Sequence, residues 1–291
     1  MINSFFNLKR GFFSTIVAST LLFNGCGEFY DRNTSTKIDI DISQGIPLKL
    51  MFLYDKNAPK EWSSAKNDDW TEGDWTEDAA IEHRKRRLYN EDLAFLNKVY
   101  GDANVSFSIV GFEPFDMGIH MENRTTEHVL DEILHKNITK DLREIYDADI
   151  IVFMKYRYRE SNIVGTANIN FGLGSRISEL GSMDISKLKS SLFGVVRYEG
   201  AASVIAHELG HVFGLTHGNP DDSMYGAFKF GRGYAINGQF ASIMTYPYLY
   251  NVSSPSTTFS NVIRPNEGDN EHNSIRALNI TGSRILELRE Y

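Results

Sequence analysis

Residues 207–217 read His-Glu-Leu-Gly-His-Val-Phe-Gly-Leu-Thr-His, and this run decides most of what the sequence reveals. On a helix, His207 and His211 stand four residues apart and project from one face, so both imidazoles can bind one metal ion. Glu208 lies beside that face, where its carboxylate can take a proton from a water molecule. Gly214 can adopt the positive φ that ends a helix, which turns the chain so that His217 becomes a third ligand. Three histidines leave one tetrahedral position of a zinc ion open, as in a catalytic site.

The short pattern His-Glu-x-x-His also occurs by chance in unrelated helices, where it is only a charged surface turn. The additional Gly214 and His217 argue against that alternative. The complete run resembles the zinc signature of the metzincin metalloproteases. A second segment, Ser-Ile-Met-Thr-Tyr at residues 242–246, is similar to the Met-turn of that clan, in which a methionine, here Met244, underlies the zinc site. Outside this resemblance, such a methionine would be ordinary core filling.

The resemblance covers roughly residues 45–291 and is strongest from residue 199 onward. The segments Phe-Ser-Asn at 259–261 and Gly-Asp-Asn at 268–270 look like the end of reprolysin-like bacterial metzincins. Gly218 departs from the residues that follow the third histidine in several families, which leaves the subfamily open. Tyr246 is similar to the tyrosine of astacin and serralysin turns, which meets the metal or the developing oxyanion. The alternative role of Tyr246 is to pack as a wall of the substrate pocket.

The order of the expected elements predicts an α/β fold with a twisted, mostly parallel sheet. We expect strands at 46–54, 105–112, 149–156, 164–171 and 192–198, helices at 76–100 and 125–145, and a loop at 172–191 that rims the active site. The metzincin resemblance adds an active-site helix, the Met-turn and one antiparallel edge strand. In that clan the edge strand pairs with extended substrate, which implies that the segment from Gly165 to Asn170, and Gly165, Thr166 and Ala167 in particular, binds peptide backbone. The alternative is that these residues only end the sheet.

The composition argues against nucleic acid as a partner, because the formal net charge of the 291 residues is −8 and the pI is near 5.5. The basic run at residues 83–87 lies in an expected helix among acidic residues, so we predict a solvated helix face. Trp62, Trp70 and Trp75 alternate with acidic residues. We interpret this stretch as a surface insertion; a calcium loop or a lid is the alternative, although the spacing does not fit an EF-hand.

The N-terminus has the features of an export signal. Lys9 and Arg10 precede an apolar stretch at residues 11–23, which is too short to span a bilayer. Leu-Phe-Asn-Gly-Cys at residues 22–26 resembles a bacterial lipobox, in which the cysteine, here Cys26, carries the lipid. We therefore expect a signal peptide at residues 1–25, a polar tether at 26–45 and a catalytic domain at 46–291. Ordinary secretory cleavage, with Cys26 incidental, remains the alternative.

These features together predict a zinc metalloendopeptidase of the bacterial cell envelope, lipid-anchored at the outer membrane or cell surface and otherwise secreted or periplasmic. Zinc-activated water would attack the peptide carbonyl, with Glu208 as general base. The expected partners are one zinc ion per chain, a protein or peptide substrate and the membrane, and the chain is expected to be a monomer. The first alternative is a non-catalytic, peptide-binding or adhesive lipoprotein that keeps the fold, and the retained Glu208 argues against it. A second alternative is a toxin with a single target.

Overall fold

The computed structural model describes residues 45–56, 58, 76–116, 124–135, 138–155, 164–198, 200–218, 224–253 and 256–291. All of these residues belong to one compact unit. The predicted signal peptide, the tether up to residue 44, Cys26 and the tryptophan-rich stretch lie outside the described residues. In the described part of the chain, every helix is too short or too polar to cross a membrane.

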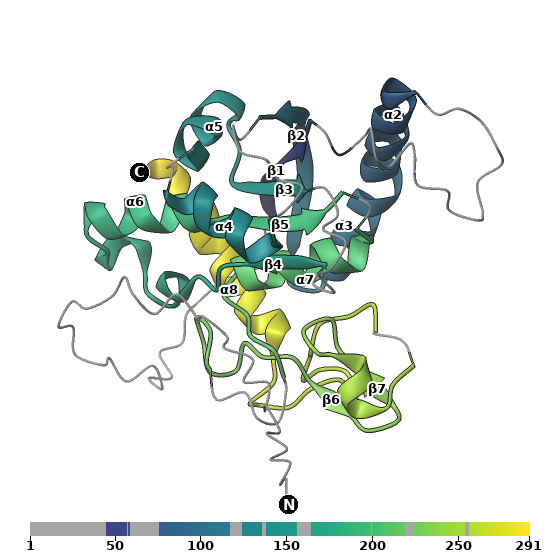
Figure 1. The fold of residues 1–291 in the computed structure, drawn as a ribbon. Coiled ribbons are helices and arrows are strands. Elements are labelled where there is room, and N and C mark those ends of the chain that lie inside the picture. Colours follow the sequence, from purple (N-terminus) through teal and green to yellow (C-terminus); the bar gives the residue numbers. More distant parts are fainter. Residues whose placement is uncertain are drawn as a thin grey trace, which may run out of the picture. The chain divides into compact units, whose positions relative to one another are not determined.

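A five-stranded sheet forms the centre of this unit (Figure 1). Its strands are β1 (Ile46–Asp55), β2 (Val105–Phe115), β3 (Ile150–Lys155), β4 (Gly165–Ala167) and β5 (Phe193–Arg197). They lie in the order β2-β1-β3-β5-β4, and all neighbours are parallel except β4, which runs antiparallel to β5. The predicted class is therefore confirmed: a mostly parallel α/β sheet with one antiparallel edge strand, consistent with a metzincin-type fold.

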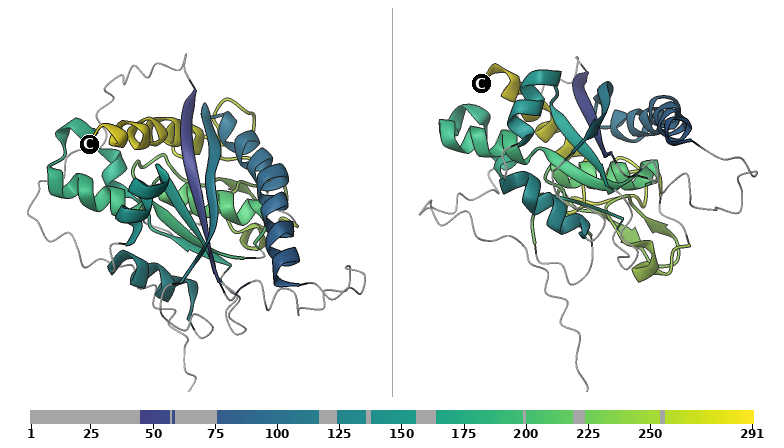
Figure 2. Two further views of the ribbon diagram at one scale, coloured as in Figure 1. Left: turned by 90° about the horizontal axis from the view of Figure 1, so that it is seen from above. Right: turned by 45° about the horizontal axis from the view of Figure 1, so that its top comes forward.

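Helices cover both faces of the sheet, as the two further views in Figure 2 show. The helical segments are α2 (Glu77–Arg87), the π-turn η1 (Leu88–Asp92), α3 (Leu93–Gly101), α4 (Thr126–His135), α5 (Ile138–Tyr146), the 3₁₀ turns η3 (Phe171–Gly174) and η4 (Ile177–Glu179), α6 (Ser182–Ser191), α7 (Ala202–Val212), η5 (Pro247–Tyr250), α8 (Ser274–Glu287) and η6 (Leu288–Glu290). A short hairpin of β6 (Ala235–Ile236) and β7 (Phe240–Ala241) lies between α7 and α8 in the sequence.

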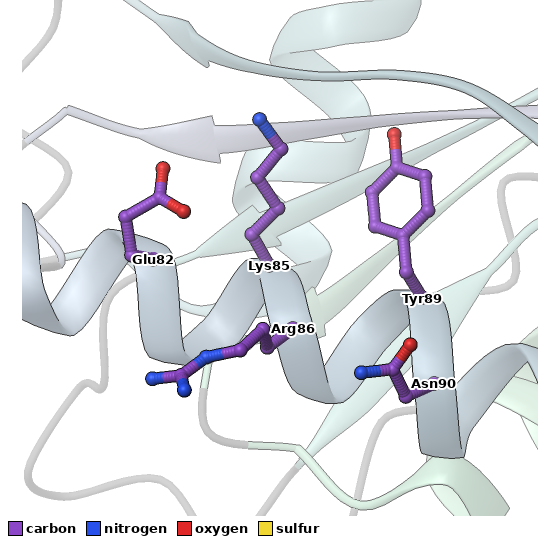
Figure 3. A pocket seen from close by; sticks show the side chains of 5 residues that line it. All are labelled: Glu82, Lys85, Arg86, Tyr89 and Asn90. Atoms are coloured by element: carbon purple, nitrogen blue, oxygen red, sulfur yellow. The ribbon is translucent and has the colours of Figure 1, made fainter.

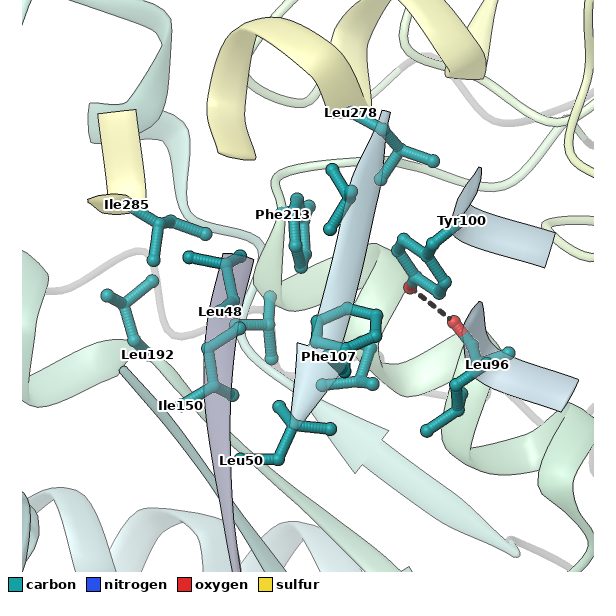
Figure 4. Close-up of a cluster of buried hydrophobic side chains, with 14 of the residues drawn as sticks. Leu48, Leu50, Leu96, Tyr100, Phe107, Ile150, Leu192, Phe213, Leu278 and Ile285 are labelled. Atoms are coloured by element: carbon teal, nitrogen blue, oxygen red, sulfur yellow. Dashed lines mark hydrogen bonds between the residues drawn. The ribbon is translucent and has the colours of Figure 1, made fainter. Parts of the chain in front are cut away.

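The core has two halves because side chains alternate across the strands. On β1, Leu48, Leu50 and Phe52 enter a large cluster with α3, α7 and α8, part of which Figure 4 draws. Met51 and Leu53, from the same strand, enter a smaller cluster with α4 on the other face. Burying each such side chain contributes roughly 1.5 to 3 kcal/mol. The sheet is thereby fixed between two helical layers, and α7 is held against it.

Most predicted strands are confirmed within one to three residues at their ends, but three expectations were wrong. The edge strand is only three residues long, and the expected loop at 172–191 contains two 3₁₀ turns and α6. Scattered glycines suggested a loop, whereas Ile185 and Leu188, three residues apart and both buried, give α6 an apolar side. The helix expected at 125–145 is two helices, α4 and α5. A single helix was predicted because the apolar period continues from one into the other.

Candidate metal centre

Helix α7 carries the centre and ends where the sequence predicts. Gly214 has φ +83°, and its N–H donates to His211 O while Leu215 N donates to Gly210 O. These two bonds form a Schellman motif, which satisfies the last carbonyls of the helix. A Cβ on Gly214 would lie 2.6 Å from the Cβ of Ala227, so the turn requires glycine for its space as well as its φ.

Three imidazoles converge at this turn. The Nε2 atom of His217 lies 2.9 Å from Nε2 of His207 and 3.0 Å from Nε2 of His211. His207 Nδ1 is 2.7 Å from Ile243 O, and His211 Nδ1 is 3.0 Å from Leu215 O. Because a carbonyl only accepts, each of these Nδ1 atoms carries the proton and each Nε2 offers a lone pair. Lone pairs facing one another at these distances fit one shared cation, so the residues present suit a zinc ion.

Burial keeps these histidines neutral. It lowers the pKa of His207 and, more strongly, that of His211, and it lowers the pKa of His217 to about 3. A metal ligand must be the neutral imidazole. The site is therefore in its metal-binding form at neutral pH without losing protons first.

Glu208 lies next to the first ligand and is almost fully buried. Its Oε2 atom has no hydrogen-bond partner among the residues that the structure describes. Gly165 of β4 faces it so closely that a Cβ there would stand 2.6 Å from Glu208 Oε1. Burial, with a smaller contribution from Glu127, raises the pKa of the Glu208 carboxyl to about 8. A bound dication would favour the ionised form and so oppose this rise.

The predicted Met-turn lies directly beneath the histidines. Thr245 N donates to Ser242 O over 3.0 Å, which closes the turn. The side chain of Met244 is fully buried against Gly210 of α7, where a Cβ would be 2.4 Å from the methionine sulfur. Met244 O also accepts from Gly218 N, the residue after the third histidine. The turn thus supports α7 and the segment that carries His217.

Tyr246 follows this turn and faces the histidines. Its ring centroid is 4.6 Å from that of His217 and 6.1 Å from that of His207. The structure therefore brings together His207, Glu208, His211, His217, Met244 and Tyr246.

The predicted substrate-binding residues divide into two groups. Gly165, Thr166 and Ala167 form β4, whose other edge ends the sheet. Asn170, which the sequence analysis places in the same edge strand, lies beyond it and is buried. Its Nδ2 donates to Val212 O over 2.7 Å and so caps the C-terminal end of α7. This asparagine supports the metal helix, and its place in the predicted edge strand was wrong.

Two further buried side chains, one bonded to α7 and one near the chain that leads into it, were not predicted from the sequence. Tyr100 is fully buried, and its hydroxyl donates 2.9 Å to Ala206 O, the carbonyl before His207 (Figure 4). Arg84 belongs to the run predicted as a solvated helix face, and for Arg84 that prediction was wrong, because it is fully buried in an ion pair with Asp92. A buried guanidinium needs a carboxylate partner, and Asp92, eight residues later, provides it.

Two sequence comparisons with known proteins bear on this centre. A family model described as "Metallo-peptidase family M12B Reprolysin-like" matches residues 89–218, a range that contains the three histidines and Glu208. The "Peptidyl-Asp metalloendopeptidase" of Pseudomonas aeruginosa is 28% identical over 179 residues, which are 55% of this chain and 29% of that protein. The chain thus spans less than a third of the length of this curated relative.

A solved structure, "Structure of a chaperone-substrate complex", aligns with 84% of this chain and 36% of its own, with a TM-score of 0.56 and 13% identity. At that identity the likeness concerns the fold alone. The family match and the relative support metal-dependent peptide hydrolysis in general terms, and the three histidines lie within metal-binding distance of one another.

Proposed function

We propose that the chain is a zinc-dependent endopeptidase with His207, His211 and His217 as its metal ligands. The observation that carries the proposal is the convergence of three Nε2 atoms next to a buried carboxylate. Two of the rings are oriented by main-chain carbonyls, as zinc-binding histidines usually are. A closed structural site would add a fourth protein ligand, whereas three histidines leave a position for catalysis.

Zinc held there would supply a Lewis acid that polarises the peptide carbonyl and makes water more acidic. Glu208 would take the proton of the attacking water and pass it to the leaving amine, which requires one carboxylate to act first as base and then as acid. Its burial excludes competing water and favours the second, protonated state. Tyr246 would donate a hydrogen bond to the oxyanion from its place beside His217.

The edge strand would hold the substrate. β4 uses one edge to pair with β5, and its other edge can accept an extended peptide as a further strand. Gly165 brings this strand into contact with Glu208, so a peptide paired with β4 would pass the general base. We assign Gly165, Thr166 and Ala167 to this backbone recognition.

The decisive test is hydrolysis of a proteome-derived peptide library by residues 27–291, with and without a chelator. The library should include acidic peptides, because the relative's name refers to peptidyl-Asp bonds. We expect chelator-sensitive cleavage at internal bonds. Binding of peptides without any cleavage would instead support the alternative of a non-catalytic, adhesive surface protein.

Glu208→Gln separates metal binding from proton transfer. We expect the variant to bind one zinc ion per chain, as the wild type does, and to lose peptide hydrolysis, because glutamine cannot accept the proton. Elemental analysis and single-turnover cleavage would measure the two properties. Loss of zinc from the variant, or undiminished turnover, would contradict the assignment of Glu208.

We also propose that Cys26 anchors the protein to the cell envelope by a lipid. Several acyl chains on one residue give stable attachment, since each buried CH₂ contributes about 0.8 kcal/mol. The wild type should label with a fatty-acid probe and sediment with membranes, and Cys26→Ser should do neither. An unmodified N-terminus on a wild-type protein in the soluble fraction would reject the anchor.

We further propose that the chain is a monomer. Size-exclusion chromatography of the soluble part should show a monomer.

A further inference from the structure

Arg84 and Asp92 form a fully buried ion pair beside the chain that leads into α7. Arg84 Nη1 lies 2.6 Å from Asp92 Oδ2, and the exposed fractions of the two side chains are 0% and 2%. Arg84 Nε donates to Tyr198 O over 2.7 Å. Arg87 Nη2 donates to Gly200 O over 3.3 Å. Both carbonyls belong to the connection from β5 to the metal helix.

The π-turn η1 makes this pair possible. In a regular α-helix, two residues eight apart are about 80° away from each other around the axis. The turn at Leu88–Asp92 has i→i+5 hydrogen bonding, with Leu93 N donating to Leu88 O, and so accommodates one more residue. Arg84 and Asp92 then correspond to an i,i+7 pair, about 20° apart and on one face. The inserted residue thus points Asp92 and Arg84 toward the same connection.

These donors lie at a connection that has no side-chain cap for the helix it leads into. The residue before α7, Ala201, makes no side-chain capping bond. A buried ion pair rarely adds stability over apolar residues of similar size, so its presence calls for another purpose. Here the guanidinium fixes a main-chain carbonyl four residues before α7 begins at Ala202. His207 lies on the second turn of that helix, whereas His217 is held separately by the turn after it.

We propose that Arg84, held by Asp92, is a positioning residue that sets the rotation of α7 and thereby the geometry of the three-histidine metal site. Rotation of α7 about its axis would move His207 and His211 together relative to His217. The consequence for catalysis rests on the proposed peptidase function, but the metal geometry can be measured without substrate.

The outward side of the same helical segment provides a control. Figure 3 shows Glu82, Lys85, Arg86, Tyr89 and Asn90 lining a depression on this side, and the residues that line it all come from α2 and η1. Arg86 is exposed, unlike Arg84 two residues earlier. Arg86→Met therefore removes a guanidinium from the same helix without touching the connection to α7.

The experiment uses three proteins. They are a double variant that carries both Arg84→Met and Asp92→Leu, the control Arg86→Met, and the wild type. Apolar residues of similar size should preserve the folded state. Urea unfolding of the metal-free proteins measures stability, chelator competition measures zinc affinity, and the visible spectrum of the cobalt-substituted protein reports ligand geometry. We expect the double variant to unfold cooperatively, at a midpoint lowered by no more than the lost donor to Tyr198 O explains, to bind zinc about 10- to 100-fold more weakly and to show a shifted cobalt spectrum. The control should match the wild type in all three.

A folded double variant with wild-type zinc affinity and cobalt spectrum would overturn the proposal. If the double variant does not fold, Arg84→Lys decides, because lysine keeps a positive charge for Asp92 but lacks the guanidinium that reaches both Asp92 and Tyr198 O. Weaker zinc binding by a folded Arg84→Lys would then support the proposal, and unchanged binding would overturn it. Failure of the peptidase function is a separate result, namely a wild type that binds zinc but cleaves no peptide.

Discussion

At the scale of single residues, removal of the Tyr246 hydroxyl distinguishes a catalytic role of this side chain from a packing role. The ring lies beside His217, and in the proposed mechanism its hydroxyl would donate a hydrogen bond to the oxyanion. We expect Tyr246→Phe to lower kcat by about 10² to 10³ with little change in KM, because the lost bond exists only in the transition state. Steady-state kinetics at full zinc occupancy measure this. A kcat within about threefold of wild type would return Tyr246 to a packing role.

Gly165 controls the space around the general base. A Cβ at this position would stand 2.6 Å from both Cγ and Oε1 of Glu208, so the carboxylate or the edge strand must shift. We expect Gly165→Ala to retain zinc and to lose at least about tenfold in kcat/KM, since small displacements of a reacting group are costly. Gly172→Ala is a matched control, because its Cβ would meet Leu188 at an ordinary 3.5 Å. Equal activity of the two variants would contradict this account.

At the scale of elements, Asn170 connects the edge-strand segment to the end of the metal helix. Asn170→Ala leaves Val212 O without this donor in a buried place. We expect the free energy of unfolding to fall by about 1 to 3 kcal/mol. Urea unfolding measures it, with Asn237→Ala as control, because the side chain of Asn237 accepts an exposed hydrogen bond from Asn251. A loss no larger than that of the control would show that α7 does not depend on this cap.

The sequence predicted those elements whose pattern comes from burial. Strands β1, β3 and β5 are short apolar runs, and their order implied the parallel sheet. The length of β4 was overestimated because a strand ends where its pairing with a neighbouring strand ends. The strand's own residues carry little information about that pairing. The π-turn was missed because i→i+5 bonding has no residue signature in Leu88–Asp92. For the same reason Arg84 was assigned to the solvent, since its burial depends on that turn.

At the scale of the whole molecule, the metal-free protein should lose stability in acid. Unfolded imidazoles bind protons below about pH 6.5, whereas burial lowers the pKa of His207, His211 and His217. The unfolded state then binds more protons, so the free energy of unfolding falls as pH falls below about 6.5. Glu208 acts in the opposite sense, because its pKa is raised to about 8 and the folded state keeps its proton. Below about pH 6.5 the unfolded state gains protons on three imidazoles, whereas the folded state keeps one additional proton on Glu208. The net effect of acid is therefore destabilising.

Urea unfolding of the metal-free protein at about pH 7.5 and pH 5.5 measures this balance. The control is the variant Glu208→Gln, which removes the opposing group and should steepen the loss in acid. A free energy of unfolding that rises toward pH 5.5 in the wild type would show that the histidines do not govern the acid response.

The histidine partners have a consequence for the evolution of the site. His207 and His211 are oriented by the main-chain carbonyl oxygens of Ile243 and Leu215. Any other amino acid at these two positions would supply the same carbonyl group. Where a carboxylate side chain performs this task, one codon change abolishes it. Here the main chain sets the orientation of the rings. Positions 243 and 215 can therefore change among apolar residues of suitable size without lowering the affinity for the metal. The sequences of diverging descendants should therefore vary at these supporting positions long before they vary at the ligands.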